Sequence, residues 1–484
     1  MTTTSSNGLA SLSACALADL VRKRSVSPID IVDDLLARLD VVEPTLNALV
    51  VLDREGAKNA ARAAEAAVMR GDALGALHGV PVTIKDIQAV AGLPTRRGSR
   101  LSDPSPAAAD SVAVARLRAA GAIIVGKTTM TEQGWTAAGE NPLTGATQNP
   151  WRIGLTPGGS SSGAAALAAA GCGPLHLGTD GAGPVRLPAH FCGVVGFKPT
   201  FGTVPYVPTP NNGLLSHIGA IARDVADAEL MVEVMAGADP LDLTSHPAGY
   251  RRAPSRSIAG LRIAFSPDLG HARVDPEIAC CVNRAAPTFE ALGAKVEVVS
   301  PSWGPRGPEL IRALWGAPLL AFTPADAASE EQMDAGLVAC LRDFAGVTWR
   351  DVNAAQARRL AYAADVGHWF AEGWDLLITP SASVAAFPHG RQVPDHWPHH
   401  AWDWLSWAEF SYPFNLSHGP AVSLPCGLTS DGLPVGLQIV GPRFADALVM
   451  RAAAAFLDAK PFQAAAFPLR PPYPIGRTSI VQNH

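Results

Sequence analysis

Cysteine is scarce in this sequence, and its spacing fits neither a disulfide framework nor a zinc site. Seven cysteines occur at irregular intervals in 484 residues, and the sequence contains no C-x-x-C and no H-E-x-x-H motif. Structural zinc and zinc-dependent hydrolysis are therefore not expected. The histidines are scattered rather than paired at ligand spacing. We expect a chain without a metal centre that folds in a reducing compartment.

Long apolar runs and an excess of basic charge are also missing. No stretch reaches the roughly 18 consecutive apolar residues that indicate a membrane-spanning helix. The start of the chain lacks the basic segment and continuous apolar run of a signal peptide. A formal net charge of −5 provides no basic field for nucleic acid or acidic membranes. We therefore expect a cytoplasmic protein with neither a membrane nor a nucleic-acid partner.

The composition indicates a large buried interior. Hydrophobic residues make up 48% of the chain and charged residues 17%, which predicts one large or two ordinary domains. Near the N-terminus, Ser27-Pro28 places a cap and a helix-compatible proline before apolar residues at helical spacing. A second, alanine-rich helix is expected over residues 54–70.

From about residue 75, short strands alternate with glycines and helices. Residues 80–86 alternate, with apolar side chains on one face and Thr83 and Lys85 on the other. Residues 120–128, 375–380 and 420–428 have buried-strand character, and residues 175–180 and 193–200 are strand-like. Residues 162–171 form a compact helix pattern whose serines could cap its start. Strands alternating with helices predict an α/β architecture.

The stretch between residues 222 and 375 has more helical spacing and fewer motifs. Its acidic, alanine-rich segment 324–336 is expected to be a solvated surface. Seven of the eleven tryptophans lie from Trp349 to Trp407. We expect the Trp-rich stretch 397–407 to serve packing, with an aromatic lid over an apolar pocket as the alternative.

Two glycine-rich segments and one lysine could carry chemistry. TPGGSSSG (156–163) leads into the alanine-rich helix, so its hydroxyls and amides would gather where negative charge is stabilised; standing alone, such a run is equally a flexible loop. In GTDGAGPVRLP (178–188), successive N–H groups could converge on an oxyanion, or the segment is a tight turn. It does not match G-x-G-x-x-G, so a dinucleotide site is not supported. Lys85 is either a surface lysine or, if buried, a neutral amine able to act as a general base.

Taken together, these segments resemble the amidase signature family. The matching stretches span most of the chain: GVPVTIKD (79–86), GAIIVGKTTMTE (121–132), NPW (149–151), TPGGSSSG (156–163), GTDGAG (178–183), RLPAHFCGVVGFKPT (186–200) and PFNLSHGPAVSLPCGLTSDGLPVGLQIVG (413–441). Several long motifs in the right order are far more specific than any one of them. Residues 222–375 are the least constrained.

The resemblance implies one large domain built on a large twisted mixed β-sheet with helices on both faces. We expect residues 1–70 to be a helical segment packed on the core, 71–221 the catalytic core, 222–375 a variable helical region around the substrate pocket, and 376–484 the rest of the core. The implied reaction is hydrolysis of C–N bonds in carboxamides, anilides or carbamates, which share tetrahedral chemistry. No metal or organic cofactor is implied, the partner is a small-molecule amide or carbamate, and a homodimer is common in the family.

The family's Ser–cis-Ser–Lys triad can be carried over position by position. Lys85 matches the general base, and Ser160 matches the bridging serine, whose peptide bond from Gly159 is expected to be cis. The oxyanion loop corresponds to Gly181, Ala182 and Gly183, and the supporting polar positions correspond to Ser161, Asp180 and Arg186.

The position of the nucleophilic serine, between Gly183 and Val185, is occupied by Pro184. Proline removes the hydroxyl that forms the acyl-enzyme and also a backbone N–H, a candidate oxyanion donor. Losing a nucleophile costs about 10⁶ in turnover and losing an oxyanion donor about 10²–10³, and the two effects overlap. We expect the chain to be nearly inactive toward amides.

Three explanations of Pro184 follow. The chain is an inactivated variant of a working amidase, a natural non-catalytic relative that binds a ligand in the old pocket, or an enzyme that uses Ser160 as a different nucleophile. The first is the most economical because every other motif is intact. The third leaves no bridging serine for proton transfer.

Two other functions compete with these. Residues 159–163 also satisfy G-x-S-x-G, which would make Ser161 a nucleophile with His389 or His418, but the preceding segment is not the apolar strand that such an elbow requires. The amidotransferase subunits that act on charged tRNA share the family scaffold. That subgroup has Thr-Gly-Gly-Ser and then Ile-Arg-Gln-Pro, where this chain has Gly-Ala-Gly-Pro and Val-Arg-Leu-Pro.

Overall fold

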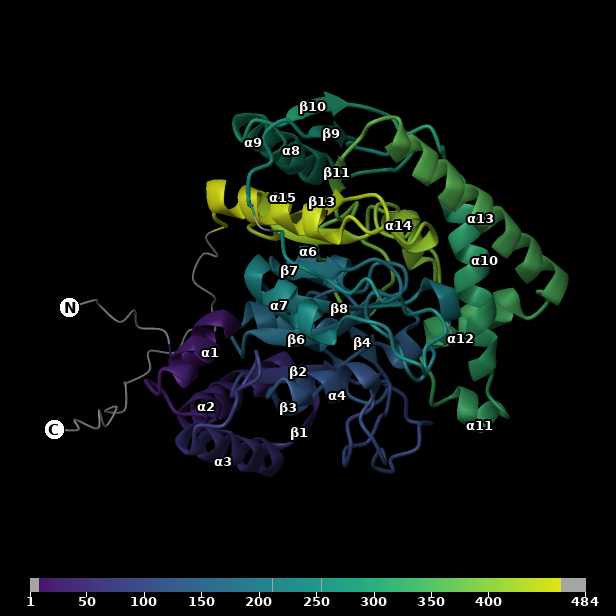
Figure 1. Cartoon of the computed structure of the whole chain (residues 1–484). Helices are drawn as coiled ribbons and strands as arrows, with labels where there is room; N and C mark the ends of the chain where they lie inside the picture. The colour runs from purple at the N-terminus through teal and green to yellow at the C-terminus, as the bar shows by residue number, and fades with distance from the viewer. Residues whose placement is uncertain (1–7, 211, 254, 463–484) are drawn as a thin grey trace.

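The computed structural model of the chain describes residues 8–210, 212–253 and 255–462. They build a mixed eleven-stranded sheet in the order β1-β3-β2-β6-β8-β7-β12-β13-β11-β9-β10 (Figure 1). The strands of this sheet are β1 (Leu49–Leu52), β2 (Pro81–Lys85), β3 (Ile123–Thr128), β6 (Leu175–Asp180), β7 (Val195–Lys198), β8 (His217–Ala222), β9 (Arg262–Phe265), β10 (Lys295–Val298), β11 (Leu376–Pro380), β12 (Ala421–Leu428) and β13 (Pro434–Val440). A separate small sheet pairs β4 (Glu140–Asn141) with β5 (Gly145–Ala146).

The large sheet has two parallel blocks joined by an antiparallel middle. Strands β3, β2 and β6 run parallel, as do β11, β9 and β10. Strands β8, β7, β12 and β13 pair antiparallel with their neighbours. Because β2 and β6 are parallel neighbours, their last residues, Lys85 and Asp180, lie toward the same edge of the sheet.

Helices cover both faces of the sheet. The side chains of successive strand residues point to opposite faces. On β8, Ile221 packs in a cluster with alanines of α5 and α6, whereas its neighbours Ala220 and Ala222 pack with α7. The helices are α1 (Ala14–Arg22), α2 (Pro28–Leu46), α3 (Arg54–Arg70), α4 (Val112–Ala119), α5 (Ser162–Ala169), α6 (Arg186–Cys192), α7 (Val225–Met235), α8 (Pro276–Ala285), α9 (Pro287–Ala291), α10 (Gly307–Leu319), α11 (Ala327–Glu330), α12 (Ala335–Phe344), α13 (Trp349–Ala371), α14 (Pro413–Leu416) and α15 (Asp446–Ala459). The predicted α/β fold with a large mixed sheet is confirmed.

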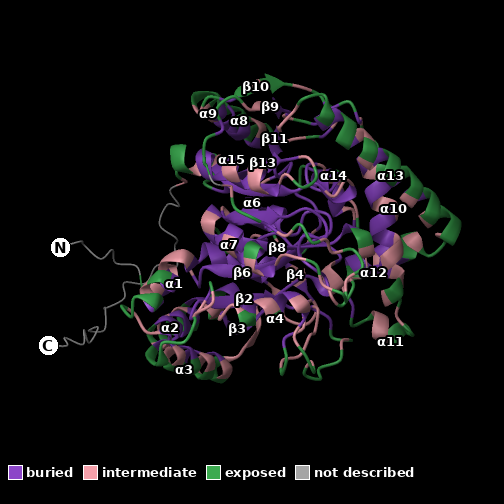
Figure 2. Ribbon diagram, viewed as in Figure 1, coloured by how far each residue is buried: buried purple, intermediate pink, exposed green. Residues whose placement is uncertain are grey.

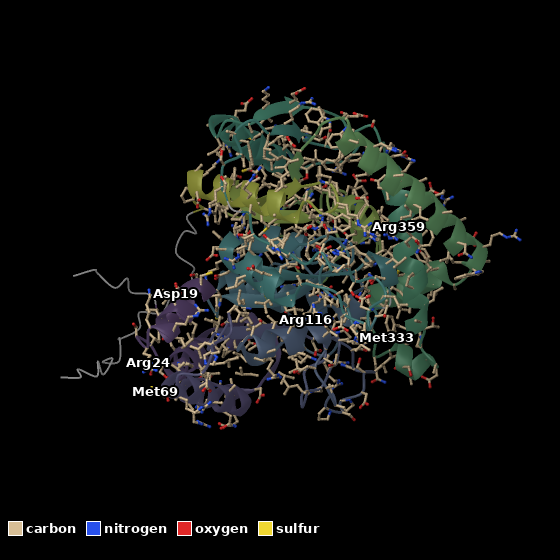
Figure 3. The ribbon with its side chains drawn as sticks, in the orientation of Figure 1. Asp19, Arg24, Met69, Arg116, Met333 and Arg359 are labelled. Carbon is tan, nitrogen blue, oxygen red and sulfur yellow. The ribbon has the colours of Figure 1, made fainter. Side chains whose placement is uncertain are left out.

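Local sequence signals account for the N-terminal helices. The Ser27 side chain accepts a hydrogen bond from the amide of Ile29 at 3.0 Å, with Pro28 as the first residue of α2. The predicted second helix is α3, which begins after Asp53 as its N-cap. Further along, Arg116 of α4 (Figure 3) donates to backbone carbonyls at and beyond the C-terminus of α7 and so joins the two helices.

Residues 222–375 contain strands as well as helices. Strands β9 and β10 form the far end of the sheet, and the sequence prediction missed both. On β10 no residue is fully buried and Val298 is 73% exposed. An edge strand of four residues with so little burial gives no apolar run to detect.

The tryptophan-rich stretch belongs to a second hydrophobic core. Trp397, Trp402, Trp404 and Trp407 are all buried, together with residues of α10, α12 and α13. These helices stand beside the sheet at the right of Figure 1, and Figure 2 shows their buried inner sides. The Trp407 ring stacks on Phe191 of α6 with ring centroids 5.6 Å apart. The expectation that these tryptophans serve packing is confirmed.

No helix among the described residues is long and apolar enough to cross a bilayer.

Candidate active site

Lys85 ends β2 as a buried amine. Strand β2 lies between β3 and β6 in the sheet, and all of its residues are buried. The Lys85 Nζ donates to Ser160 Oγ at 2.7 Å and to Thr179 Oγ1 at 2.9 Å. Burial lowers the pKa of Lys85 to about 7, against an opposing effect of the Asp180 carboxylate. A substantial share of the amine is therefore neutral near pH 7.

Ser160 sits in the glycine-serine loop immediately before α5. The Gly159–Ser160 peptide bond is cis, as predicted. Ser160 is buried, and a Cβ built on Gly134 would lie 3.4 Å from its Oγ, at ordinary van der Waals distance. The loop therefore brings the serine hydroxyl to the lysine within a buried site.

The neighbouring Ser161 does not cap α5, contrary to the expectation from sequence. It occupies the N-cap position, but no side-chain cap hydrogen bond forms. Its hydroxyl instead lies 3.4 Å from both the backbone N and the backbone O of Thr179. Ser161 thus ties the loop to β6, beside the residue that also binds Lys85.

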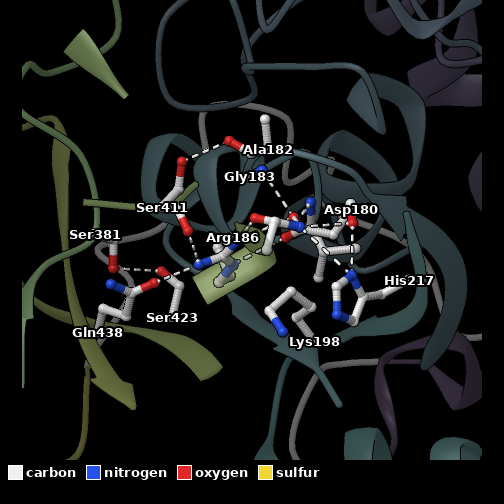
Figure 4. Close-up of polar contacts among 12 residues, drawn as sticks. Asp180, Ala182, Gly183, Arg186, Lys198, His217, Ser381, Ser411, Ser423 and Gln438 are labelled. Carbon is white, nitrogen blue, oxygen red and sulfur yellow. Dashed lines mark hydrogen bonds and ion pairs between the residues drawn. The ribbon is translucent and has the colours of Figure 1, made fainter. Parts of the chain in front are cut away.

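Asp180 and Arg186 close the ends of the glycine loop with a buried ion pair. Arg186 donates to the two carboxylate oxygens through Nε and Nη2, both at 2.9 Å (Figure 4). Burial alone would raise the pKa of Asp180, but Arg186 and further donors hold it at about 2. The carboxylate is consequently charged, and it organises the segment between these two residues.

The amide of Gly183 is already engaged within this loop. It donates to Asp180 Oδ1 at 2.7 Å, and the Val185 amide donates to Asp180 Oδ2 at 3.3 Å. Gly183 has a φ of 128°, which requires glycine. Of the three residues matched to an oxyanion loop, Gly181 and Ala182 are therefore the ones whose amides remain as candidates for binding an oxyanion.

One pocket brings three of the predicted residues together. Ser160, Gly181 and Pro184 line it, beside Thr179. Its apolar wall consists of Ile87, Trp315 and Leu319, and its other polar residues are Gln133, Tyr206, Asn212 and Ser216. Pro184 thus faces the same space as the Ser160 hydroxyl, at the position where the sequence pattern calls for a nucleophile.

Sequence reasoning missed several residues that hold this site. Asn415 and Gln438 bind Arg186 through their side-chain oxygens, at 2.6 and 2.7 Å. Thr179 is the second partner of Lys85. Asn415 and Gln438 lie within the C-terminal segment 413–441 that carries the resemblance, which could have singled them out. Nothing in the sequence alone pairs them with Arg186.

The competing nucleophile-elbow arrangement is not assembled. The His418 Nε2 contacts the Leu214 carbonyl at 2.7 Å and also the Arg359 side chain. The hydroxyl of Ser161 bonds to Thr179, and neither ring nitrogen of His389 has a hydrogen-bond partner among the described residues. Neither histidine is therefore hydrogen-bonded to Ser161.

Comparison with known proteins gives a consistent result. A family model described as Amidase matches residues 30–336 and 341–450. The chain is similar to an acylamidase of Rhodococcus erythropolis, with 39% identity over 463 residues that cover 93% of this chain and 96% of the relative. Among solved structures, a bacterial aryl acylamidase of the amidase signature family superposes with a TM-score of 0.86 at 28% identity, covering 93% of this chain and 96% of that one. A 6-aminohexanoate cyclic dimer hydrolase, solved with its substrate, also superposes with a TM-score of 0.86, at 30% identity over 95% of this chain and 99% of that one.

Proposed function

This chain belongs to the amidase family. We propose that its scaffold is built to hydrolyse small carboxamides through a relay of one lysine and two serines. In this chain Pro184 stands at the position of the second serine, the nucleophile. One observation carries the proposal. The buried Lys85 Nζ lies 2.7 Å from Ser160 Oγ, and Ser160 and Pro184 line the same pocket. A base, a bridging hydroxyl and a glycine loop in one pocket are the parts that acyl transfer needs.

The relay is proposed to move one proton in two steps. With serine at position 184, its hydroxyl oxygen attacks the carbonyl carbon while its proton passes to Ser160 Oγ, whose own proton passes to neutral Lys85. The lysine returns a proton through Ser160 to the departing amine as the C–N bond breaks. Water then cleaves the ester by the same route and restores the serine.

Proline at position 184 blocks the first step of this reaction, the attack on the carbonyl carbon. The ring supplies no hydroxyl and no N–H, so neither the ester bond nor a donor from residue 184 is available. We propose Gly181 and Ala182 as the remaining oxyanion donors, because the Gly183 amide is bonded to Asp180. The chain as it stands is thus proposed to be an amidase scaffold with very low turnover.

We propose an amide with an apolar or aromatic group as the substrate, from the residues at the site and from the relatives. Ile87, Trp315 and Leu319 offer an apolar wall, while Asn212 and Ser216 offer polar groups. The similarity to an acylamidase and to an aryl acylamidase favours the same class. We propose anilides and alkyl amides, with carbamates as chemically equivalent candidates.

A chromogenic anilide and two variants at position 184 test the proposal. Pro184→Ser restores the hydroxyl and the N–H together, whereas Pro184→Ala restores the N–H alone. We expect hydrolysis to rise at least about 10³-fold for the serine variant and far less for the alanine variant. Equal rates for the two variants, with both folded by circular dichroism, would show that position 184 does not supply the nucleophile.

A binding protein is the second candidate, and Pro184 itself favours it. The pocket, the ion pair and the lysine–serine bond are all intact although the nucleophile position lacks a hydroxyl. Isothermal titration of the unmodified chain with small amides and carbamates tests this function. Micromolar binding without turnover would support it, and the serine variant would then gain little activity.

A further inference from the structure

The Ala182–Gly183 peptide of the glycine loop is held from both of its edges. Its N–H, from Gly183, donates to Asp180 Oδ1 at 2.7 Å. Its C=O, from Ala182, lies 2.6 Å from the hydroxyl oxygen of Ser411 (Figure 4). The same hydroxyl lies 2.8 Å from the Ala408 carbonyl, and the shorter distance favours Ala182 as the acceptor of its proton. A peptide unit is planar, with its C=O and N–H on opposite edges. Two bonds at these edges therefore fix the rotation of the plane.

Ser411 is in turn bonded to Arg186, the residue at the C-terminal end of the same loop. Its carbonyl accepts from Arg186 Nη1 at 2.7 Å, and Arg186 is paired with Asp180. Its own amide donates to Ala408 at 2.9 Å. The side chain is fully buried. Ser411 thus holds a set position relative to the loop although it lies 229 residues away from Ala182 in sequence.

The Ser411 hydroxyl also packs closely against the loop. A Cβ built on Gly183 would lie 2.5 Å from Ser411 Oγ. Next in sequence is Pro184, which lines the pocket together with Ser160. Rotation of the Ala182–Gly183 plane would therefore change the direction in which residue 184 enters the pocket.

We propose that Ser411 is a positioning residue for the amidase reaction. Its hydroxyl holds the Ala182–Gly183 peptide in the orientation that directs residue 184 toward Ser160 and leaves the Ala182 amide to face the substrate carbonyl. This inference rests on the proposed function, because the orientation of the loop matters to turnover only if the pocket performs acyl transfer. Ser411 itself touches no reacting atom.

Another buried serine provides a matched control. Ser423 of β12 is fully buried and its hydroxyl bonds to that of Ser381 at 2.8 Å (Figure 4). Removing either hydroxyl leaves a buried polar atom without its partner, which costs comparable stability. Only the Ser411 hydroxyl, however, is bonded to the glycine loop.

The kinetic test uses these serines in the Pro184→Ser chain. We expect Ser411→Ala to lower kcat about 10- to 100-fold with KM within about 2-fold, because the substrate still binds while the reacting groups are misplaced. Ser411→Thr keeps the hydroxyl and is expected to recover most of the kcat. Ser423→Ala is expected to leave kcat within about 2-fold. An unchanged kcat for Ser411→Ala, or an equal loss for Ser423→Ala, overturns the proposal.

A second measurement separates this inference from the proposed function. In the unmodified chain, Ser411→Ala is expected to speed hydrogen exchange of the Gly183 amide about 10-fold, and Ser423→Ala is expected to leave it unchanged. If the Pro184→Ser chain is inactive but this exchange changes, the proposed function fails and Ser411 still positions the Ala182–Gly183 peptide. If the exchange does not change, the positioning role of Ser411 is wrong. Ser411→Cys, whose thiol is a weak donor, serves if the alanine variant does not fold.

Discussion

The Lys85 amine donates to the Ser160 hydroxyl at 2.7 Å, and both side chains are buried. The bond joins the end of β2 to the loop before α5, two elements 75 residues apart in sequence. A protonated lysine here would hold its charge in a buried site, which disfavours the charged form. A neutral lysine can accept the serine proton, so the proposed relay requires Lys85 to be neutral.

The pH dependence of turnover should follow the deprotonation of Lys85. Because burial lowers the pKa of Lys85 to about 7, the neutral base accumulates as the pH rises through that value. In the Pro184→Ser chain, kcat/KM for an anilide should therefore rise with pH between about 6 and 8 and level off above. Removing the Thr179 hydroxyl, an acceptor that favours the charged amine, should move the inflection to lower pH. A rate that falls over this range contradicts the role of Lys85 as base.

Lys85 and Ser160 should act as one unit. In the Pro184→Ser chain, Lys85→Met or Ser160→Ala should each lower kcat by about 10³-fold or more, and the double variant should lose little beyond either single one. Ser162→Ala is the matched control, since Ser162 is buried at the start of α5 and its hydroxyl has no hydrogen-bond partner among the described residues. Steady-state kinetics with a chromogenic anilide measures all four. Additive losses would mean that the two residues do not share a proton path.

The parts of this site that depend on short stretches of sequence could be predicted. The position of Lys85 at a strand end and of Ser160 before a helix follow from local patterns, and the structure places both as expected. The long-range contacts could not be predicted. Ser411 contacts Arg186 although the two residues are 225 positions apart in the sequence. A single sequence contains no signal that pairs residues over such a separation.

Missing sequence signals also explain where the predicted and the observed strands differ. Strands such as β3 and β11 were predicted because burial on both faces gives each of them a short apolar run. Strand β10 has no fully buried residue and lies at the end of the sheet. The engagement of the Gly183 amide by Asp180 was likewise hidden, since a glycine-rich motif does not reveal which amide a nearby carboxylate takes.

The buried pair of Asp180 and Arg186 should be essential to the fold. Replacing Arg186 with methionine leaves a buried carboxylate without its cation, which should lower the free energy of unfolding by about 3–5 kcal/mol. The exposed pair of Arg256 and Asp458, with side chains 58% and 61% exposed, is the control. Arg256→Met should change the free energy of unfolding by less than about 1 kcal/mol. Urea denaturation of both variants measures the difference, and similar losses would contradict the role of the buried pair.

Gly183 should tolerate no side chain, for two separable reasons. Its φ of 128° is a conformation that L-residues avoid, and an added Cβ would lie 2.5 Å from Ser411 Oγ. Gly171 has a φ of 70° but nothing within 4 Å of an added Cβ, so Gly171→Ala measures an unfavourable backbone conformation without a clash. We expect Gly171→Ala to cost about 1 kcal/mol of unfolding free energy and Gly183→Ala about 2–4 kcal/mol. In the Pro184→Ser chain, Gly183→Ala should also lower kcat, because the methyl group pushes the Ala182–Gly183 peptide away from Ser411, whereas Gly171→Ala should leave kcat unchanged. Equal effects of the two substitutions on kcat would show that the orientation of this peptide does not govern turnover.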